Sequence, residues 1–217
     1  MNQQTKKLST LGMLSALAII SMLLINIRLM PAAPFLTYDP KDVVIVIGGF
    51  MFGPLAALLM SVVVAFIEMI TVSDTGPFGF LMNTISSATF ACSAAIIYKH
   101  MRSLKGAVIG LVAGALLATG VMLLWNYLIV PLYMEVPRHV VVGMLLPIFA
   151  PFNLLKFGLN AGFAMLLYKP LKSAISATRM LPETDKELQK TKLNIGVLVG
   201  AAFVVLTCVL AVWAMSA

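Results

Sequence analysis

The sequence predicts an all-α integral membrane protein, a six-helix bundle with one additional transmembrane helix at its C-terminal end. Two observations carry this prediction. The 217 residues are 61% hydrophobic and only 11% charged, with a mean hydropathy of +1.02. A soluble domain has no interior large enough to bury that much apolar surface. In addition, polar or proline-rich stretches divide the chain into seven apolar runs.

These runs are assigned as membrane segments in chain order. The first is too long for the core of a cleaved signal peptide, so it is expected to remain as a helix. The second has ten residues, about 15 Å as a helix, so it is either tilted with its flanks or partly embedded and buried by other helices. The sixth is expected to bend near Pro147 and Pro151. The predicted ranges are 8–28, 43–52, 55–72, 79–98, 106–132, 140–168 and 193–217.

The segments group into three parts. Residues 1–172 are predicted to form a substrate-binding membrane domain, residues 173–192 a polar cytoplasmic connector, and residues 193–217 the additional transmembrane helix. Between the first two segments, residues 30–42 contain three prolines and two aspartates. Because such a stretch cannot continue a helix, it is predicted to be a structured loop at the membrane surface.

The distribution of Lys and Arg sets the orientation. With the N-terminus in the cytoplasm, eleven of the 15 cations fall in inner segments, three in outer loops and one, Lys156, within the membrane. Cytoplasmic segments carry such an excess. The N-terminus is therefore predicted to be cytoplasmic and the C-terminus to lie outside. This topology accounts for the net charge of +7, which needs no nucleic-acid partner.

A lysine and two asparagines interrupt the sixth apolar segment. At helical spacing, Asn153, Lys156 and Asn160 share one face. Lys156 precedes the next cation, Lys169, by 12 residues, or roughly 18 Å of helix, which places it deep in the membrane. A cation there costs several kcal/mol unless a polar partner faces it. Two interpretations stay open: Lys156 pairs with a carboxylate that holds the bundle together, or it faces a ligand.

Other polar side chains lie towards the outer ends of their predicted helices, among them Glu68, Asn83 and Asn126. The inner halves are almost purely apolar, which favours a pocket that opens outward and not a continuous pore. Any one of these asparagines alone is more often a helix–helix hydrogen bond than a ligand contact. Cys92 and Cys208 lie singly in apolar runs and form neither a disulfide nor a metal pattern.

The run Asp39-Pro-Lys-Asp-Val-Val-Ile-Val-Ile-Gly-Gly-Phe-Met-Phe-Gly-Pro54 resembles a motif of the substrate-binding S components of energy-coupling factor (ECF) vitamin transporters, and in particular of the riboflavin-specific members. The likeness covers about residues 8–172. It implies that polar residues of the fifth and sixth segments hold the flavin and its ribityl chain, beneath an outer loop that acts as a lid. The candidate ligand-binding residues are Phe35, Tyr38, Asp39, Glu68, Asn83, Asn126, Asn153, Lys156 and Asn160.

The resemblance also implies partners. In that family the S component, in the bacterial plasma membrane, joins a transmembrane scaffold subunit and two cytoplasmic ATPase subunits. Small residues on the first helix form the docking face, to which Gly12 and Ala16 correspond here, with Ser15 beside them. The alternative is that this small-residue pair packs within the chain's own bundle. The chain has no Gly-x-x-x-x-Gly-Lys-Ser/Thr loop, so it is predicted to be a transporter subunit and not itself an ATPase.

Riboflavin is thus expected as the transported ligand, and no cofactor or metal is expected. Three alternatives remain. The chain binds a different vitamin or precursor, or it is a proton-coupled carrier that uses Glu68 and Lys156. The third alternative is a membrane enzyme in which Glu68, Asp74 and Lys156 perform acid–base chemistry, although no catalytic motif supports that. The additional helix at residues 193–217 has no counterpart in the six-helix core and no role suggested by the resemblance.

Overall fold

The computed structural model describes residues 3–30, 33, 35–177 and 195–216. A two-stranded antiparallel hairpin, β1 (Ile27–Arg28) and β2 (Thr37–Tyr38), joins the first two helices. A π-helical turn, η1 (Leu145–Phe149), joins α6 to α7. The helices are α1 (Gln3–Leu24), α2 (Lys41–Phe52), α3 (Pro54–Thr71), α4 (Gly76–Met101), α5 (Leu104–Tyr133), α6 (Arg138–Met144), α7 (Ala150–Ala177) and α8 (Ile195–Ser216).

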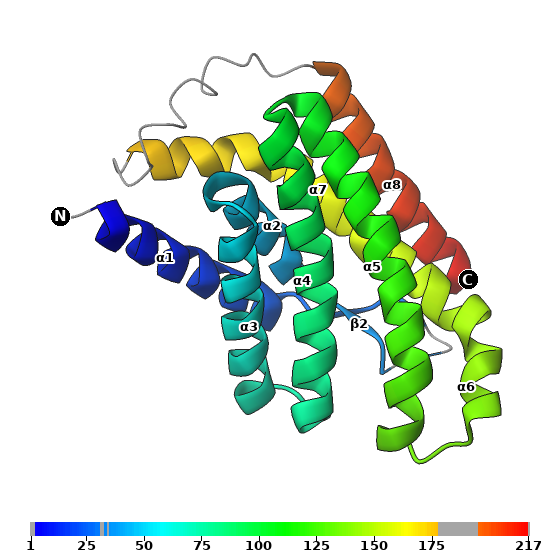
Figure 1. The fold of residues 1–217 in the computed structure, drawn as a ribbon. Coiled ribbons are helices and arrows are strands. Elements are labelled where there is room, and N and C mark those ends of the chain that lie inside the picture. The colour runs from blue at the N-terminus through cyan, green and yellow to red at the C-terminus, as the bar shows by residue number, and fades with distance from the viewer. Residues whose placement is uncertain (1–2, 31–32, 34, 178–194, 217) are drawn as a thin grey trace.

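Five described segments are long and apolar enough to cross a membrane: α1, α3, α4, α5 and the run Arg138–Leu171. These segments confirm the prediction of a mostly helical, multi-pass membrane protein. The exact count of six helices plus one additional helix stays a prediction. The apolar part of α8, Leu198–Trp213, is shorter. Figure 1 shows α3, α4 and α5 running alongside one another. α1 crosses at a steep angle on one side of the bundle, and α8 lies on the other side (Figure 1).

The short second segment is buried by its neighbours. α2 has 12 residues, which span only about 18 Å. Every residue from Lys41 to Met51 is buried, and α2 contacts α1, α3, α4 and α7. Of the two alternatives for this segment, the structure supports the one in which other helices bury it. Because other helices cover α2 on all sides, its N-terminal residues lie in the interior of the bundle.

The structure corrects the predicted entry to this helix. The first helix ends at Leu24 and not near residue 28, because the chain then pairs Ile27 with Tyr38 in the hairpin. The second helix begins at Lys41, directly after Pro40. Lys41 and Asp42 were expected in an outer surface loop, but they form the first turn of α2 and are 1% and 0% exposed. Pro40 suits this position because a helix start requires no backbone donor there.

The sixth predicted segment is interrupted where its prolines stand. Pro147 lies within η1, and Pro151 lies in the first turn of α7, so the expected bend is confirmed. Proline produces such a break because it lacks the backbone donor of a regular helix. α7 then continues to Ala177, beyond the predicted end at residue 168. The predicted connector therefore begins as helix, and most of it lies outside the described residues.

Small residues allow α4 and α5 to pack closely. A Cβ atom built on Gly110 of α5 would lie 2.7 Å from the Ala94 carbonyl oxygen of α4. A Cβ on Gly114 would lie 2.8 Å from the Phe90 carbonyl oxygen. These approaches are shorter than side chains tolerate, so glycine is needed where the two backbones meet.

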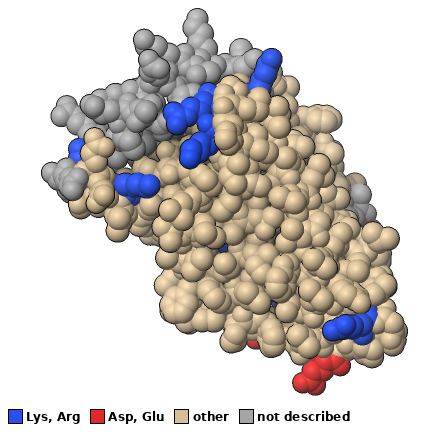
Figure 2. Space-filling view, in the orientation of Figure 1, with Lys and Arg blue, Asp and Glu red and all other residues tan. Residues whose placement is uncertain are grey.

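The exposed charges are asymmetric. Figure 2 shows Lys and Arg side chains gathered at the end of the molecule where α4 turns into α5, with tan surface between this end and the other. The turn itself contains Lys99, Arg102 and Lys105. The band between the ends matches the exposed apolar side chains of α3 and α5, such as Leu55 and Leu116. Lipid can cover such a band, while water or headgroups meet the charged ends.

Candidate ligand-binding site

A cavity of about 570 Å³ lies among the hairpin, α3, α4, α5 and α7. Each of these elements contributes at least one polar or charged side chain to its wall. The polar lining residues are Asn26, Arg28, Thr37, Asp39, Glu68, Ser73, Asp74, Thr75, Asn83, Ser86, Asn126, Tyr133, Asn153 and Lys156. The apolar lining residues are Phe35, Leu36, Val72, Met82, Met122 and Phe152. This volume and mixture are typical of a site for a small organic molecule.

The structure brings seven of the nine candidate ligand-binding residues together in the cavity wall: Phe35, Asp39, Glu68, Asn83, Asn126, Asn153 and Lys156. Tyr38 and Asn160 are not part of this lining. Both are buried, and the Tyr38 hydroxyl donates to the Asn160 amide oxygen at 3.1 Å. Tyr38 and Asn160 therefore support the wall from behind.

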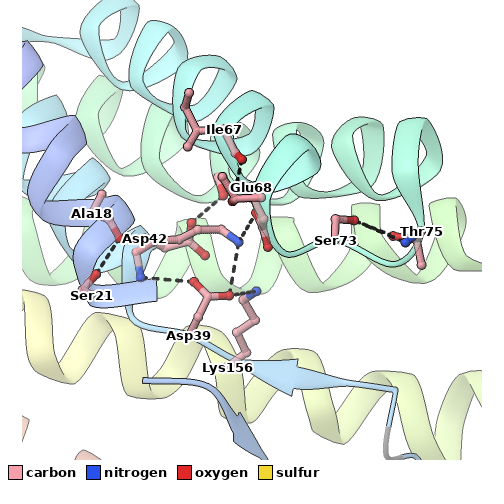
Figure 3. Close-up of polar contacts among 12 residues, drawn as sticks. Ala18, Ser21, Asp39, Asp42, Ile67, Glu68, Ser73, Thr75 and Lys156 are labelled. Atoms are coloured by element: carbon pink, nitrogen blue, oxygen red, sulfur yellow. Dashed lines mark hydrogen bonds and ion pairs between the residues drawn. The ribbon is translucent and has the colours of Figure 1, made fainter. Parts of the chain in front are cut away.

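Lys156 both pairs with a carboxylate and faces the cavity. Its ammonium lies 3.5 Å from Asp39 Oδ2, and Figure 3 shows the two side chains pointing toward one another. Among the described residues, the Lys156 ammonium donates one hydrogen bond, which goes to Asp39. An ammonium has three N–H donors, so Lys156 retains donors for a ligand. The two interpretations of Lys156 are thus compatible.

Lys41, predicted from the sequence to lie in a loop, links the acidic groups of the wall. Its ammonium contacts Glu68 Oε2 at 2.7 Å and Asp39 Oδ2 at 3.2 Å, and its backbone N–H donates to Asp39 Oδ1. Asp39 therefore lies between two lysines (Figure 3). The apolar run at residues 43–52 is too short to span the membrane, which indicates a buried segment, and this is a sequence signal that Lys41 just before it also enters the interior.

Asp42 forms a second polar group behind the first. It accepts hydrogen bonds from the Ser87 hydroxyl of α4 and, at 3.3 Å, from the Asn160 amide of α7. Asn160 accepts in turn from Tyr38 of the hairpin. These contacts tie α2, α4, α7 and the hairpin together at the base of the site. Buried polar groups with several mutual hydrogen bonds fix side-chain positions more firmly than apolar packing alone.

Electrostatics fix the protonation of the hairpin groups. Burial alone would raise the pKa of Asp39, but attraction to Lys156 and Lys41 outweighs burial and holds that pKa below its ordinary value. Burial raises the pKa of Tyr38, and the neighbouring Asp39, Asp42 and Cys208 raise it further. At neutral pH, Asp39 is therefore an anion between two cations, and Tyr38 keeps the proton that it donates to Asn160.

The two asparagines nearest the site are held by their own helices. Asn126 donates from its side-chain amide to the Met122 carbonyl, and Asn153 donates to the Phe149 carbonyl, each at 2.7 Å. Within the described residues, neither side-chain oxygen accepts a hydrogen bond. Both residues are buried and line the cavity. Each side chain is therefore fixed and retains an acceptor and one N–H donor for a ligand.

The chemistry of the wall suits binding more than catalysis. Three charged residues of the wall, Asp39, Glu68 and Lys156, are already in ion pairs, and the fixed amides offer donors and acceptors to a neutral polar ligand. In the part of the chain that the structure describes, no group of three or more His, Cys, Asp or Glu is placed to hold a metal ion. The apolar residues Phe35, Met122 and Phe152 offer a surface for a flat ring.

A model of the family described as the substrate-specific component of ECF transporters matches residues 6–168. The match includes the hairpin, α2 and the part of α7 that lines the cavity. The chain belongs to this family. The resemblance seen in the sequence is thereby confirmed, and the chain is an S component, a multi-pass membrane protein that forms part of a transporter.

Named relatives and a solved structure agree with this placement. The riboflavin transporter RibU of Staphylococcus aureus is 32% identical over 177 residues, which are 78% of this chain and 92% of that protein. The riboflavin transporter FmnP of Bacillus subtilis is 28% identical over 190 residues, covering 81% and 97%. A solved S component of a bacterial ECF transporter has a TM-score of 0.67 and 30% identity, covering 79% of this chain and 98% of its own.

The predicted docking residues of this S component lie on α1. Gly12 and Ala16 are exposed, and a Cβ atom built on Gly12 would meet nothing within 4 Å. Ser15 is buried within the chain and does not share this face. Gly12 and Ala16 therefore form a small-residue surface next to the large exposed side chains of Met13 and Leu17, and its docking role stays a prediction.

Proposed function

We propose that the chain captures riboflavin on the outer side of the membrane, as the substrate-binding subunit of an ATP-driven ECF uptake transporter. The observation that carries the proposal is the cavity with Lys156 and two fixed asparagines in its wall. The names of the relatives from Staphylococcus aureus and Bacillus subtilis support riboflavin as the ligand. The isoalloxazine ring is flat and largely apolar, with carbonyls and nitrogens along one edge.

In the proposed complex, the apolar faces of the ring lie against Phe35, Met122 and Phe152. Lys156 donates to a carbonyl or ring nitrogen at the polar edge, because it lines the cavity and retains N–H donors beyond its pair with Asp39. The amides of Asn126 and Asn153 pair with the remaining polar atoms or with ribityl hydroxyls. Several fixed hydrogen-bonding groups in an otherwise apolar cavity give orientation and specificity.

The energy for transport comes from partners in this proposal. A transmembrane scaffold subunit meets the exposed face around Gly12 and Ala16, and two cytoplasmic ATPase subunits attach to that scaffold. The concentration of Lys and Arg at the α4–α5 turn supports a cytoplasmic location for this end, with the cavity towards the outside. The N-terminus is then cytoplasmic and the C-terminus external.

A titration of the detergent-purified chain with riboflavin tests the ligand. We expect saturable quenching of flavin fluorescence at one riboflavin per chain. A panel of other vitamins, added in excess before riboflavin, should leave the titration unchanged. If riboflavin caused no quenching and another vitamin bound, the cavity would be assigned to that vitamin instead.

The structure also bears on the proton-coupled alternative. Glu68 pairs with Lys41, and Lys156 pairs with Asp39, so neither is a lone titratable group in the described residues. An ATP-driven subunit should therefore support riboflavin uptake in cells that depends on ATP and on the scaffold. Uptake that persists without ATP and stops when an uncoupler is added would favour the carrier.

Replacing Asn126 with alanine is expected to weaken riboflavin binding by about tenfold, because a hydrogen bond inside a site contributes roughly 1–1.5 kcal/mol. Thr119→Ala is the matched control. Thr119 lies on the same helix and donates to its own helix at Ala115, as Asn126 does at Met122, but it does not line the cavity. Fluorescence titration of both variants checks the prediction, which fails if the two bind alike.

Replacing both Gly12 and Ala16 with leucine is expected to abolish association with the scaffold subunit while leaving riboflavin binding intact. The added side chains occupy the surface that a second helix needs for close approach. Gly120→Leu on α5 serves as the control, since its Cβ position is equally open. Co-purification of the scaffold with each variant measures the effect, and undiminished recovery with the double variant would rule out this face as the docking site.

A further inference from the structure

The eighth helix lies beyond the region shared with the family, yet it packs closely on α7. The family match ends at residue 168, and α8 begins at Ile195. A Cβ atom built on Gly162 of α7 would lie 2.6 Å from Val205 Cγ2 and 3.3 Å from the Ala201 carbonyl oxygen. A Cβ on Gly158 would lie 3.2 Å from Cys208 Sγ. Two glycines four residues apart thus form the seat of α8.

The same face of α8 also belongs to the apolar cluster that includes the hairpin. This cluster joins three segments that are distant in sequence. It contains Leu29, Met30, Ala33, Leu36 and Tyr38 from the hairpin region, Phe152 and Leu159 from α7, and Val205, Cys208 and Val212 from α8. Cys208 also lies near enough to Tyr38 to raise the pKa of its hydroxyl. α8 therefore contacts the cluster at the level of the hairpin, in addition to its glycine seat on α7.

The hairpin needs such support because its own pairing is minimal. Each strand has two residues, and the register joins Ile27 to Tyr38 and Arg28 to Thr37. A pair of strands this short is not stable by itself in water. Yet the hairpin supplies a large part of the cavity wall, including Arg28, Phe35 and Asp39. Its position therefore depends on what it packs against.

We propose that α8 is a positioning helix: seated on Gly158 and Gly162, it holds the hairpin against the cavity and so slows the release of bound ligand. The effect on release rests on the proposed function, whereas the seating of α8 and the order of the hairpin do not. Figure 1 shows α8 on the side of the bundle away from α1. This position leaves the small-residue face of α1 open to a partner.

A disulfide tests the seating. Gly158→Cys in a Cys92→Ser background leaves two cysteines, the introduced one on α7 and the natural Cys208 on α8. The distance of 3.2 Å between the built Cβ and Sγ is compatible with a disulfide. We expect rapid and nearly complete disulfide formation on oxidation in the membrane. The control, Gly120→Cys in the same background, should form none. Equal and slow oxidation of both variants would overturn the seating of α8.

A steric variant tests the role. Gly162→Leu should push α8 off its seat, because its side chain would overlap Val205. We expect faster hydrogen exchange at residues 27–30 and 35–38, unchanged exchange within α4 and α5, and about tenfold faster riboflavin release with little change in the association rate. Gly120→Leu is the control and should show none of these changes.

A rescue keeps the test independent of general damage to the fold. Gly162→Ala alone should speed hairpin exchange, and adding Val205→Ala, which removes the overlapping methyl groups, should reverse most of that effect. Unchanged hairpin exchange in Gly162→Leu, or unchanged riboflavin release, would overturn the proposal. If the wild-type chain bound no riboflavin, the proposed function would fail, while the exchange measurement would still decide whether α8 holds the hairpin.

Discussion

Replacing Lys156 with methionine is expected to lower the affinity for riboflavin by roughly 10- to 100-fold. A hydrogen bond from a charged group contributes about 1.5–3 kcal/mol, and methionine retains the apolar stem while removing the donors. Lys156 is 6% exposed and lines the cavity, so the variant removes donors from within the site itself. The expected loss appears mainly as faster dissociation, because the variant removes a contact made after the ligand has entered.

Fluorescence titration of Lys156→Met beside Lys99→Met measures the loss. Lys99 is exposed in the last turn of α4, about 20 Å along the helix from the lining residue Ser86, so its replacement should leave affinity unchanged. Thermal unfolding of both variants separates lost binding from lost structure. If Lys156→Met bound riboflavin as tightly as the wild type, Lys156 would serve only to neutralise Asp39.

Replacing Lys41 with methionine is expected to destabilise the empty protein by roughly 3–5 kcal/mol, the typical cost of removing one partner from a buried ion pair. Lys41 is 1% exposed and contacts both Asp39 and Glu68, so its loss leaves Glu68 without a cation in the described residues. For a chain of this length, the cost corresponds to a fall in Tm of about 10 °C. The effect should exceed that of Lys156→Met because Lys41 pairs with two carboxylates and Lys156 with one.

Thermal unfolding of the detergent-purified variant measures this effect. Adding Glu68→Gln to Lys41→Met should restore part of the stability, because the double variant no longer holds an unpaired carboxylate at this partly buried position. Lys99→Met provides the control for the loss of an exposed lysine. A Tm within 1–2 °C of the wild type, about the change expected of a surface substitution, would show that the Lys41 contacts contribute little to stability.

The sequence alone was sufficient for the parts of the molecule that depend on length and apolar composition. The helices from Pro54 to Tyr133 follow from long apolar runs, and the break near Pro147 follows from the chemistry of proline. Lys156 was recognisable because a cation in an apolar helix needs a polar partner. Asn153 followed from its place on the same helical face.

The charged network was not predictable in the same way. Lys41 and Asp42 follow Asp39 and Pro40 in a proline-rich stretch, so local composition indicates a surface loop. Only the burial of α2 on all sides brings these residues beside Glu68 and Ser87, and that burial is a tertiary effect. Similarly, Tyr38 was expected in the ligand site, but its hydroxyl is directed to Asn160, which no sequence pattern reports.

The seat of α8 has a recognisable pattern in the sequence. Gly158 and Gly162 stand four apart in an apolar helix, the spacing typical of close helix contacts in membranes. The polar face of Asn153, Lys156 and Asn160 dominates the same stretch, so one helix carries two functions on different sides. A sequence pattern shows that a second helix can approach the glycines, but only the structure shows that it is α8.

The most direct test of riboflavin capture is the amount of flavin that stays with the purified chain. The protein, produced in cells supplied with riboflavin, is passed through gel filtration in detergent, and its absorption spectrum is recorded beside that of Lys156→Met. We predict about one flavin per wild-type chain and little in the variant. A colourless wild-type protein that also fails to take up added riboflavin would contradict the assignment of the cavity to riboflavin, although the chain would remain an S component.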